Sequence, residues 1–326
     1  MNLRLAIYEL AGHYGLDGPA TQRLVELGGV ERQPASLLRL LERGIGILAA
    51  VLSGLGLVFW IAANWDSLGR SGQFALLQSL VALACAGAWL RPALRVPLGL
   101  LAFIAIGALF AYFGQTYQTG ADRWQLFALW AALSLPLALA LRSDSLWTAW
   151  ALVAMTAIAL WMMAHTGHRW RVEPYDLPVH LAGWGAALLI TIALSPLAQR
   201  FTGAGFWSLR LGVTLSVMLI TITAVFGLFA RQVAPHYYFG LVMLAVGAAV
   251  FSRPRLFDIF NISAIGLGLN VVLFAGMCKL LFTGHKNGDE VGILLLLGLA
   301  AAGMLAATVQ LILKLTRANQ AQGEAP

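Results

Sequence analysis

Charge is scarce in this sequence. Only 11% of its 326 residues are charged, whereas an ordinary soluble domain carries about 25%. Apolar residues make up 60% of the chain, and the mean hydropathy is +0.80. A soluble fold of this size would need more charge to cover its surface, so lipid is the expected solvent for most of the chain.

Cysteine is nearly absent as well. The two cysteines, Cys85 and Cys278, lie in or near apolar runs and indicate neither a disulfide framework nor a zinc site. The first 43 residues hold no continuous apolar stretch, so we expect no cleavable signal peptide, and the first span would act as the insertion signal.

The basic residues form no stripe or patch. The formal net charge of +7 comes from 21 Lys and Arg residues scattered between apolar runs. Because nucleic-acid binding requires such residues to be clustered, we expect no nucleic-acid partner.

Motifs of membrane enzymes are also missing. The sequence has no HExxH, no G-x-S-x-G elbow, no CxxC, no paired-carboxylate motif and no glycine-rich phosphate loop. Asp258 stands at the entry of an apolar run, and Arg210 and Lys279 lie near the ends of runs, where long side chains reach water. We therefore expect a protein that is not an enzyme and holds no cofactor, and an ion-driven carrier is disfavoured.

Long apolar runs predict an all-α polytopic transmembrane helix bundle, because about 20 apolar residues in a helix cross a bilayer. The ten predicted spans are 44–62, 72–90, 97–113, 124–141, 145–164, 179–198, 207–230, 235–251, 257–282 and 291–313. The run at 235–251 is short, and whether it fully spans stays open. The chain then divides into a cytoplasmic helical segment at 1–43, the bundle at 44–313 and a cytoplasmic tail at 314–326.

The distribution of positive charge predicts the orientation. With both termini in the cytoplasm, 14 of the 21 Lys and Arg residues fall on the cytoplasmic side and 7 on the outer side. This bias favours cytoplasmic N- and C-termini. Together with an Arg-, Ala- and Leu-rich composition, it points to a bacterial inner membrane.

The N-terminal segment shows helical spacing of its own. Gly15 is a plausible helix end, and Asp17 with Pro19 can begin a second helix. We expect a hairpin with a shared apolar surface of Leu3, Ile7, Leu10 and Leu24, and a third helix that begins near Pro34 and continues into the first span. The alternative is an amphipathic segment lying on the membrane without a partner.

The polar side chains deep within the spans are uncharged. Asn270 and its neighbours suggest hydrogen bonds between helices or, alternatively, a polar pathway. The pairs Gly183/Ala187 and Gly298/Ala302 have the spacing of close helix packing within a bundle.

The loops on the predicted outer side carry the candidate binding residues. An aromatic and amide patch could bind a headgroup or a sugar, and its members are Asn64, Trp65, Asp66, Gln115, Tyr117 and Trp124. The competing interpretation is an aromatic belt at the membrane interface. Histidines gather on the same side, at 165, 168, 180, 236 and 285, but a metal site would require loops of several hairpins to converge, and we expect none.

Three features in order resemble a family of predicted bacterial membrane proteins, catalogued as domain of unknown function 2157. These are Gly15-Leu16-Asp17, then Ala62-Ala63-Asn64-Trp65-Asp66, then Gly114-Gln115 through Trp124 with Trp130, Pro136 and Arg142-Ser143 beyond it. The resemblance covers roughly residues 1–150 and implies a location and an architecture, not a reaction.

Two functions remain open. In the first, the protein is a non-catalytic envelope component that acts through a protein partner bound by residues 1–43. In the second, it is a transporter or facilitator of a small molecule or lipid. In both, the lipid bilayer is its surrounding partner.

Overall fold

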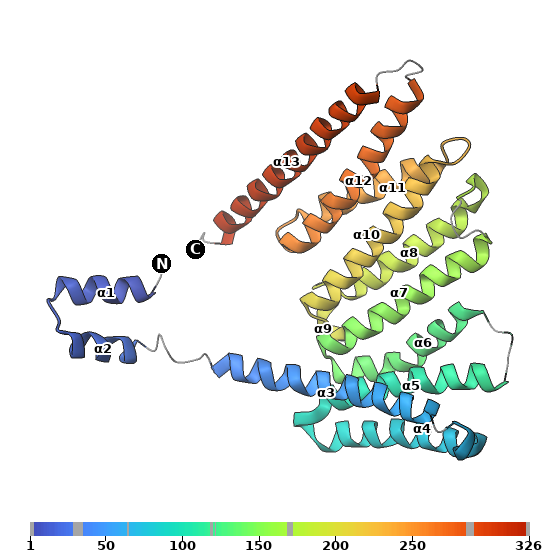
Figure 1. Cartoon of the computed structure of the whole chain (residues 1–326), viewed down its shortest axis with the longest axis horizontal. Helices are drawn as coiled ribbons and strands as arrows, with labels where there is room; N and C mark the ends of the chain where they lie inside the picture. Colours follow the sequence, from blue (N-terminus) through green and yellow to red (C-terminus); the bar gives the residue numbers. More distant parts are fainter. Residues whose placement is uncertain are drawn as a thin grey trace.

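The computed structural model describes residues 3–28, 35–63, 65–117, 120, 122–167, 172–284 and 290–323. Every regular element within these ranges is a helix, which confirms the predicted all-α fold. Figure 1 shows most of the helices side by side in a bundle, with the first two helices lying apart from it.

The N-terminal segment forms the predicted hairpin. α1 (Leu3–His13) is followed by Gly15, whose φ of +60° is the left-handed conformation that closes a helix. α2 (Gly18–Leu27) begins after Asp17, whose carboxylate accepts a hydrogen bond from the Ala20 N–H at 3.0 Å.

The apolar surface between these two helices is narrower than predicted. Ile7 is buried and packs on Gly28, where a Cβ atom would stand 2.7 Å from Ile7 Cδ1. Leu24 is half-buried, but Leu10 is 49% exposed, so its predicted place in the shared surface is wrong. Two helices this short cover only a thin stripe of each other, and Leu10 lies outside it; the side chain of Leu3 lies outside the described residues.

Each of the ten predicted spans contains one helix, although α8 ends at Ala193, five residues before the predicted end of that span at 198. The ten helices are α3 (Ala35–Ala63), α4 (Trp65–Leu90), α5 (Arg95–Tyr117), α6 (Arg123–Leu141), α7 (Asp144–Thr166), α8 (Leu177–Ala193), α10 (Phe206–Leu228), α11 (Pro235–Phe251), α12 (Ile259–Gly284) and α13 (Glu290–Gly323). Short elements join some of them, namely the 3-10 turns η1 (Pro92–Leu94) and η2 (Pro174–Asp176) and the helix α9 (Gln199–Thr202).

α8 and α11 are the two shortest of the ten helices, with 17 residues each. In the described part of the chain, nine helical segments are long and apolar enough to cross a membrane, and α8 is among them because the turn η2 extends it to 20 residues (Pro174–Ala193), whereas α11 is not. At about 1.5 Å per residue, α11 is roughly 26 Å long, a little less than the hydrocarbon core of about 30 Å.

The predicted segment boundaries fall inside helices. α3 begins at Ala35 and passes through position 43 without a break, as expected for a third helix that runs into the first span. α13 likewise continues past position 313. The three-part division of the chain therefore stays a prediction based on composition.

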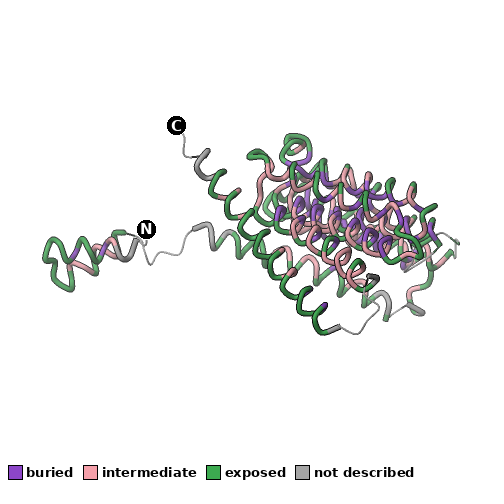
Figure 2. The backbone as a smooth tube through the Cα atoms, turned by 90° about the horizontal axis from the view of Figure 1, so that it is seen from above, coloured by how far each residue is buried: buried purple, intermediate pink, exposed green. Residues whose placement is uncertain are grey.

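The middle of the bundle is its most buried part. In the most apolar window of α7 and of α10, 44% of the residues are buried, against 11% in α3 and in α13. One core cluster surrounds Trp147 and another surrounds Trp184. Figure 2 shows the buried residues concentrated in the bundle and the exposed ones along its edges. α7 and α10 are thus central, and α3 and α13 offer their apolar faces to lipid.

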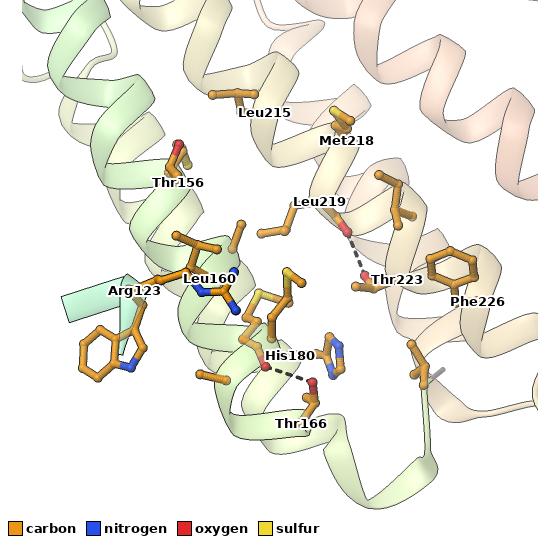
Figure 3. Close-up of a pocket in the computed structure, with 18 of the residues that line it drawn as sticks. Arg123, Thr156, Leu160, Thr166, His180, Leu215, Met218, Leu219, Thr223 and Phe226 are labelled. Carbon is orange, nitrogen blue, oxygen red and sulfur yellow. Dashed lines mark hydrogen bonds between the residues drawn. The ribbon is translucent and has the colours of Figure 1, made fainter. Parts of the chain in front are cut away.

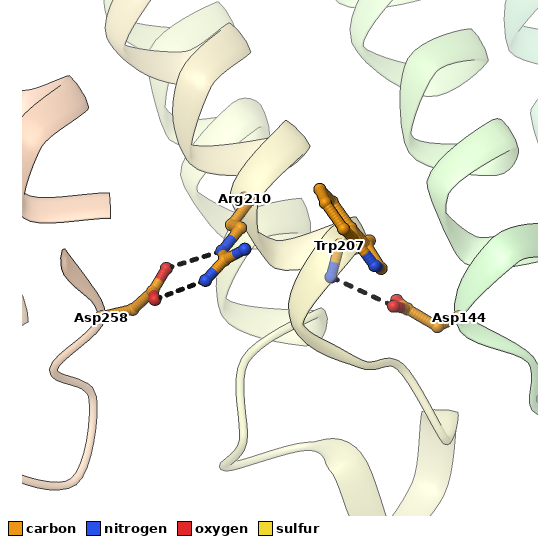
Figure 4. A network of polar contacts seen from close by, with 4 residues as sticks. All are labelled: Asp144, Trp207, Arg210 and Asp258. Atoms are coloured by element: carbon orange, nitrogen blue, oxygen red, sulfur yellow. Dashed lines mark hydrogen bonds and ion pairs between the residues drawn. The ribbon is translucent and has the colours of Figure 1, made fainter. Parts of the chain in front are cut away.

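The turn between α6 and α7 clamps the start of α10. Arg142 adopts a left-handed φ of 50°, which makes a tight hairpin between α6 and α7. Asp144, the first residue of α7, then accepts hydrogen bonds from the backbone N–H groups of Gly205 at 2.9 Å, Trp207 at 3.0 Å and Ser208 at 3.0 Å. A carboxylate from one helix therefore caps the N-terminus of another (Figure 4), which fixes α7 and α10 together at this end.

An ion pair ties α10 to α12 at the same end. The guanidinium of Arg210 donates to both carboxylate oxygens of Asp258, at 2.9 Å and 2.8 Å (Figure 4). It also lies 5.0 Å from the Phe206 ring centroid. This hydrogen bonding holds the pKa of the Asp258 carboxyl below its usual range. Arg210 is thus paired and bonded, in addition to lying near a helix end as predicted.

Candidate functional site

A groove lies between α7 and α10 in the described part of the chain (Figure 3). Its volume is about 760 Å³, within the roughly 300–1,000 Å³ typical of ligand sites. α7 and α10 form its two walls, the start of α6 lies at one end, and His180 of α8 also lines it.

The groove is buried on one side and open on the other. On α7, Met155 and Met162 are buried and form the floor. On the rim, Met163 is 44% exposed and Met218 of α10 is 55% exposed. Because these rim residues belong to membrane-spanning helices, the open side faces the space that lipid would fill.

The hydroxyl groups of the floor are already engaged by the protein. Thr166 donates to the Met162 backbone oxygen at 3.0 Å, and Thr223 donates to the Leu219 backbone oxygen at 2.8 Å (Figure 3). Thr223 also accepts from Trp184 Nε1 at 3.1 Å. These groups therefore present a largely apolar wall to a ligand.

The groove is long in the direction of the helices. Its α7 lining runs from Leu152 to Thr166, about 21 Å at 1.5 Å per residue. The hydrocarbon core of a bilayer is about 30 Å thick. The groove therefore extends from the end of α7 past the middle of that helix, and its length suits an elongated apolar chain.

Charged and polar groups gather at the end where α6 begins. Arg123 and Asp122 both line the groove there, and Arg123 has no hydrogen bond or ion pair to any described residue. Trp124 also lines this end, and its indole Nε1 atom is buried without a hydrogen-bond partner within the described ranges. A buried donor left unpaired costs about 1–3 kcal/mol, so an acceptor bound at this end would stabilise it.

Two histidines meet beneath the groove. His180 is buried, His236 is completely buried, and their rings lie 4.7 Å apart between centroids in an edge-to-face arrangement. His180 Nδ1 is 3.2 Å from His236 Nε2 and 3.0 Å from the backbone oxygen of Asp176. The two histidines are 56 positions apart in the chain; both were predicted on the outer side, but no local spacing indicates that they pair.

The carbonyl contact assigns the proton positions of this pair. A carbonyl oxygen only accepts, so His180 Nδ1 carries the hydrogen and shares it between Asp176 and His236. The neutral His236 ring then carries its own hydrogen on Nδ1, which has no partner among the described residues. His180 Nε2 is left as an acceptor on a residue that lines the groove.

The predicted outer patch is placed only in part. Asn64 lies outside the described residues, as do the side chains of Trp65 and Asp66. Gln115 is exposed, and Tyr117 packs 6.0 Å from the ring of Phe74 between centroids. The patch as a whole stays a prediction.

Trp124 is the patch residue that belongs to the groove. Its ring centroid lies 6.0 Å from that of His165 on α7, so Trp124 and Tyr117 contact different aromatic neighbours. Trp124 was predicted as an interface residue from its place at the end of a span, but no local spacing predicts that it lies beside α7 and α10.

Other sequence hypotheses have a structural outcome. Asn270 exchanges hydrogen bonds with Thr308 of α13 at 3.0 Å and 3.2 Å, which is the interhelical bonding expected; it does not line the groove.

Gly183 packs closely, because a Cβ there would lie 2.3 Å from Met162 Sδ. Gly298 has open space around it, so the predicted packing at Gly298/Ala302 within the bundle is wrong. That face of α13 points away from the chain.

Metal-ligating groups do not converge in the described part of the chain. No set of three or more His, Cys, Asp or Glu residues there could hold an ion. His168 and His285 lie outside the described residues.

Residues 15–147 match the family model described as Predicted membrane protein (DUF2157), which confirms the resemblance over that range. The match includes the α6 end of the groove, at 122–124, and stops near the start of α7. None of the curated proteins or solved structures compared with the chain matches it. The comparisons therefore support a membrane protein and indicate no activity for it.

Proposed function

We propose that this multi-pass membrane protein works by binding a membrane lipid in the groove between α7 and α10, without catalysing a reaction. The observation that carries the proposal is the groove itself, with about 760 Å³ of space, apolar walls and an open side on two spanning helices. Of the two functions that remained open from the sequence, the groove favours the second, in which the protein handles a small molecule or lipid.

Shape and depth support a lipid over a compact solute. The floor side chains are methionine and other apolar groups, which pack against hydrocarbon. The lining extends about 21 Å along α7. A polar end with Arg123 and Trp124 completes an amphipathic site, with tail and headgroup regions in the order that a bilayer lipid requires.

The non-catalytic part of the proposal rests on the sequence. No catalytic motif occurs in it, and the Thr166 and Thr223 hydroxyls in the floor donate to backbone oxygens. Neither hydroxyl is paired, among the described residues, with a base that would activate it as a nucleophile.

Location and orientation belong to the same proposal. The charge bias of 14 to 7 supports cytoplasmic termini in a bacterial inner membrane. In that orientation the α6 end of the groove lies at the outer leaflet, and the clamp formed by Asp144 lies at the cytoplasmic side.

A second candidate function uses the N-terminal segment, residues 1–43. α1 and α2 lie apart from the bundle (Figure 1), and Tyr14 and Leu27 are 70% and 86% exposed. Large apolar side chains on a separate hairpin favour a protein partner. Such a partner would make the protein an envelope component that acts through an assembly.

Lipid retention tests the main proposal. The purified full chain is transferred to a mild detergent, and bound lipids are counted by native mass spectrometry. Ala159→Trp places an indole in the groove, whereas Ala186→Trp adds the same group to a half-buried position on α8 away from it. We expect the first variant to lose the retained lipid and the second to keep it. Equal retention in both variants would rule out the groove as the lipid site.

A further inference from the structure

We infer that the α6 end of the groove recognises an anionic, phosphate-type headgroup of the lipid that the groove holds. This inference rests on the proposed lipid binding and names the chemistry of the ligand's polar end. Three independent groups on the first residues of α6 and the turn before it carry it.

The first group is the guanidinium of Arg123. It lines the groove and is exposed, and it has no ion-pair or hydrogen-bond partner within the described residues. Arg210, by comparison, is fully committed to Asp258. An arginine at a helix end that has no partner among the described residues is available for a bidentate contact with phosphate oxygens.

The second group is the indole N–H of Trp124. This atom is buried, it lacks a partner among the described residues, and its side chain lines the same end of the groove. An indole nitrogen can only donate. Its partner has to be an acceptor, and a phosphate oxygen of a headgroup at this end of the groove would supply one.

The third group is the N-terminus of α6. Asp122 occupies the N-cap position with extended backbone angles, but its side chain makes no capping hydrogen bond. The N–H of Gln125 donates to the Asp122 backbone oxygen at 3.0 Å, so the N–H groups of Arg123 and Trp124 are the ones of this 19-residue helix that keep their capacity for an outside acceptor. A helix N-terminus also carries partial positive charge, which favours an anion.

One carboxylate opposes this assignment and makes it testable. Asp122 is exposed, lines the groove beside Arg123 and forms no ion pair with it. It repels an anionic headgroup and would attract a cationic one. Replacing Asp122 and Arg123 in turn must therefore shift affinity in opposite directions, and the sign of each shift identifies the charge of the ligand.

The test is a lipid competition on the intact protein. The full chain, in detergent with defined amounts of phosphatidylglycerol and phosphatidylcholine of equal tail length, is analysed by native mass spectrometry for the lipid retained. Arg123→Gln, Asp122→Asn and a control, Arg70→Gln, are compared with the native chain. Arg70 is an exposed arginine of α4 that does not line the groove.

We expect the native chain to prefer the anionic phosphatidylglycerol. Arg123→Gln should lower its retention by about tenfold, because a hydrogen bond to a charged group is lost. Asp122→Asn should raise it, and Arg70→Gln should leave it unchanged. Inorganic phosphate at equal concentration should not displace it, since phosphate lacks the tail.

The other outcomes overturn the inference in distinguishable ways. Equal retention of both lipids, still abolished by Ala159→Trp, would remove the headgroup claim and leave the groove as a lipid site. Stronger binding in Arg123→Gln with weaker binding in Asp122→Asn would assign a cationic headgroup. Displacement by phosphate alone would assign a soluble anion. Lipid retention unaffected by Ala159→Trp would remove the proposed function itself.

Discussion

The cap that Asp144 places on α10 leads to a quantitative prediction. Its carboxylate accepts three backbone hydrogen bonds, at 2.9 Å, 3.0 Å and 3.0 Å, from Gly205, Trp207 and Ser208. Loss of a single capping side chain costs about 0.5–2 kcal/mol, and hydrogen bonds to charged groups contribute about 1.5–3 kcal/mol. Because Asp144 is half-buried and water can replace part of the loss, we expect Asp144→Ala to destabilise the bundle by about 2–3 kcal/mol. Asp144→Asn keeps one acceptor oxygen and should lose about half as much.

The chain offers a matched control for this cap. Asp122 also stands at a helix N-cap, but its side chain makes no capping hydrogen bond. Asp122→Ala should therefore change the free energy of unfolding by less than about 0.5 kcal/mol. The assay is reversible unfolding in mixed micelles with increasing sodium dodecyl sulfate, followed by circular dichroism. A loss below about 1 kcal/mol for Asp144→Ala, or an equal loss for Asp122→Ala, would refute the reasoning.

Four further predictions follow from other parts of the molecule. Since Arg210 lowers the pKa of Asp258, the stability from this pair is present above the ordinary aspartate pKa of about 3.9 and is lost as the pH falls through the lowered value. Asp258→Asn should remove that acid-dependent part of the unfolding free energy, and an unchanged pH profile would contradict this. Gly183→Ala should push Met162 toward the groove and reduce lipid retention in native mass spectra, whereas Gly185→Ala has open space and should not; equal retention would argue against a packed floor. Ile7→Asp should make the N-terminal hairpin sensitive to limited proteolysis, unlike Tyr8→Asp at a position 61% exposed, and resistance in both would mean that Ile7 does not hold the hairpin. Cysteines placed at Thr119, His168 and Asn287, which lie outside the described residues, should be labelled in intact cells; labelling only after permeabilisation would reverse the topology.

The fold was predictable because lipid imposes a simple rule on sequence. A spanning helix must be a long apolar run, so each of the ten runs could be read directly, including the short one that became α11. Local signals in the N-terminal segment were equally direct. Gly15 could close a helix and Asp17 could cap the next because both effects act within a few residues.

The groove was not predictable, because it depends on which faces of distant helices meet. Met155 and Met218 resemble any other apolar residues of a span, and only the packing of α7 against α10 makes one a floor and the other a rim. Because lipid tails are as apolar as packed side chains, apolar periodicity does not distinguish a lipid-facing side of a helix from a packed one. For the same reason Gly298 was assigned to the bundle interior, although it faces outward.

The contacts of the polar side chains were not predictable for the same reason. Arg123 and Trp124 were visible as loop-end residues, but their lack of partners appears only once the neighbouring helices are placed. His180 and His236 pair across 56 residues, a contact for which helical spacing gives no signal.

Photo-crosslinking of the reconstituted protein tests the central claim most directly. Phosphatidylglycerol with a photoreactive group in its tail is activated in the bilayer, and labelled peptides are identified by mass spectrometry. We expect labelling that concentrates on the groove residues of α7 and α10, such as Leu152 and Met218, and that excess unlabelled phosphatidylglycerol removes. Labelling of the exposed faces of α3 and α13 at the same level, with no reduction by the competitor, would contradict a specific lipid site.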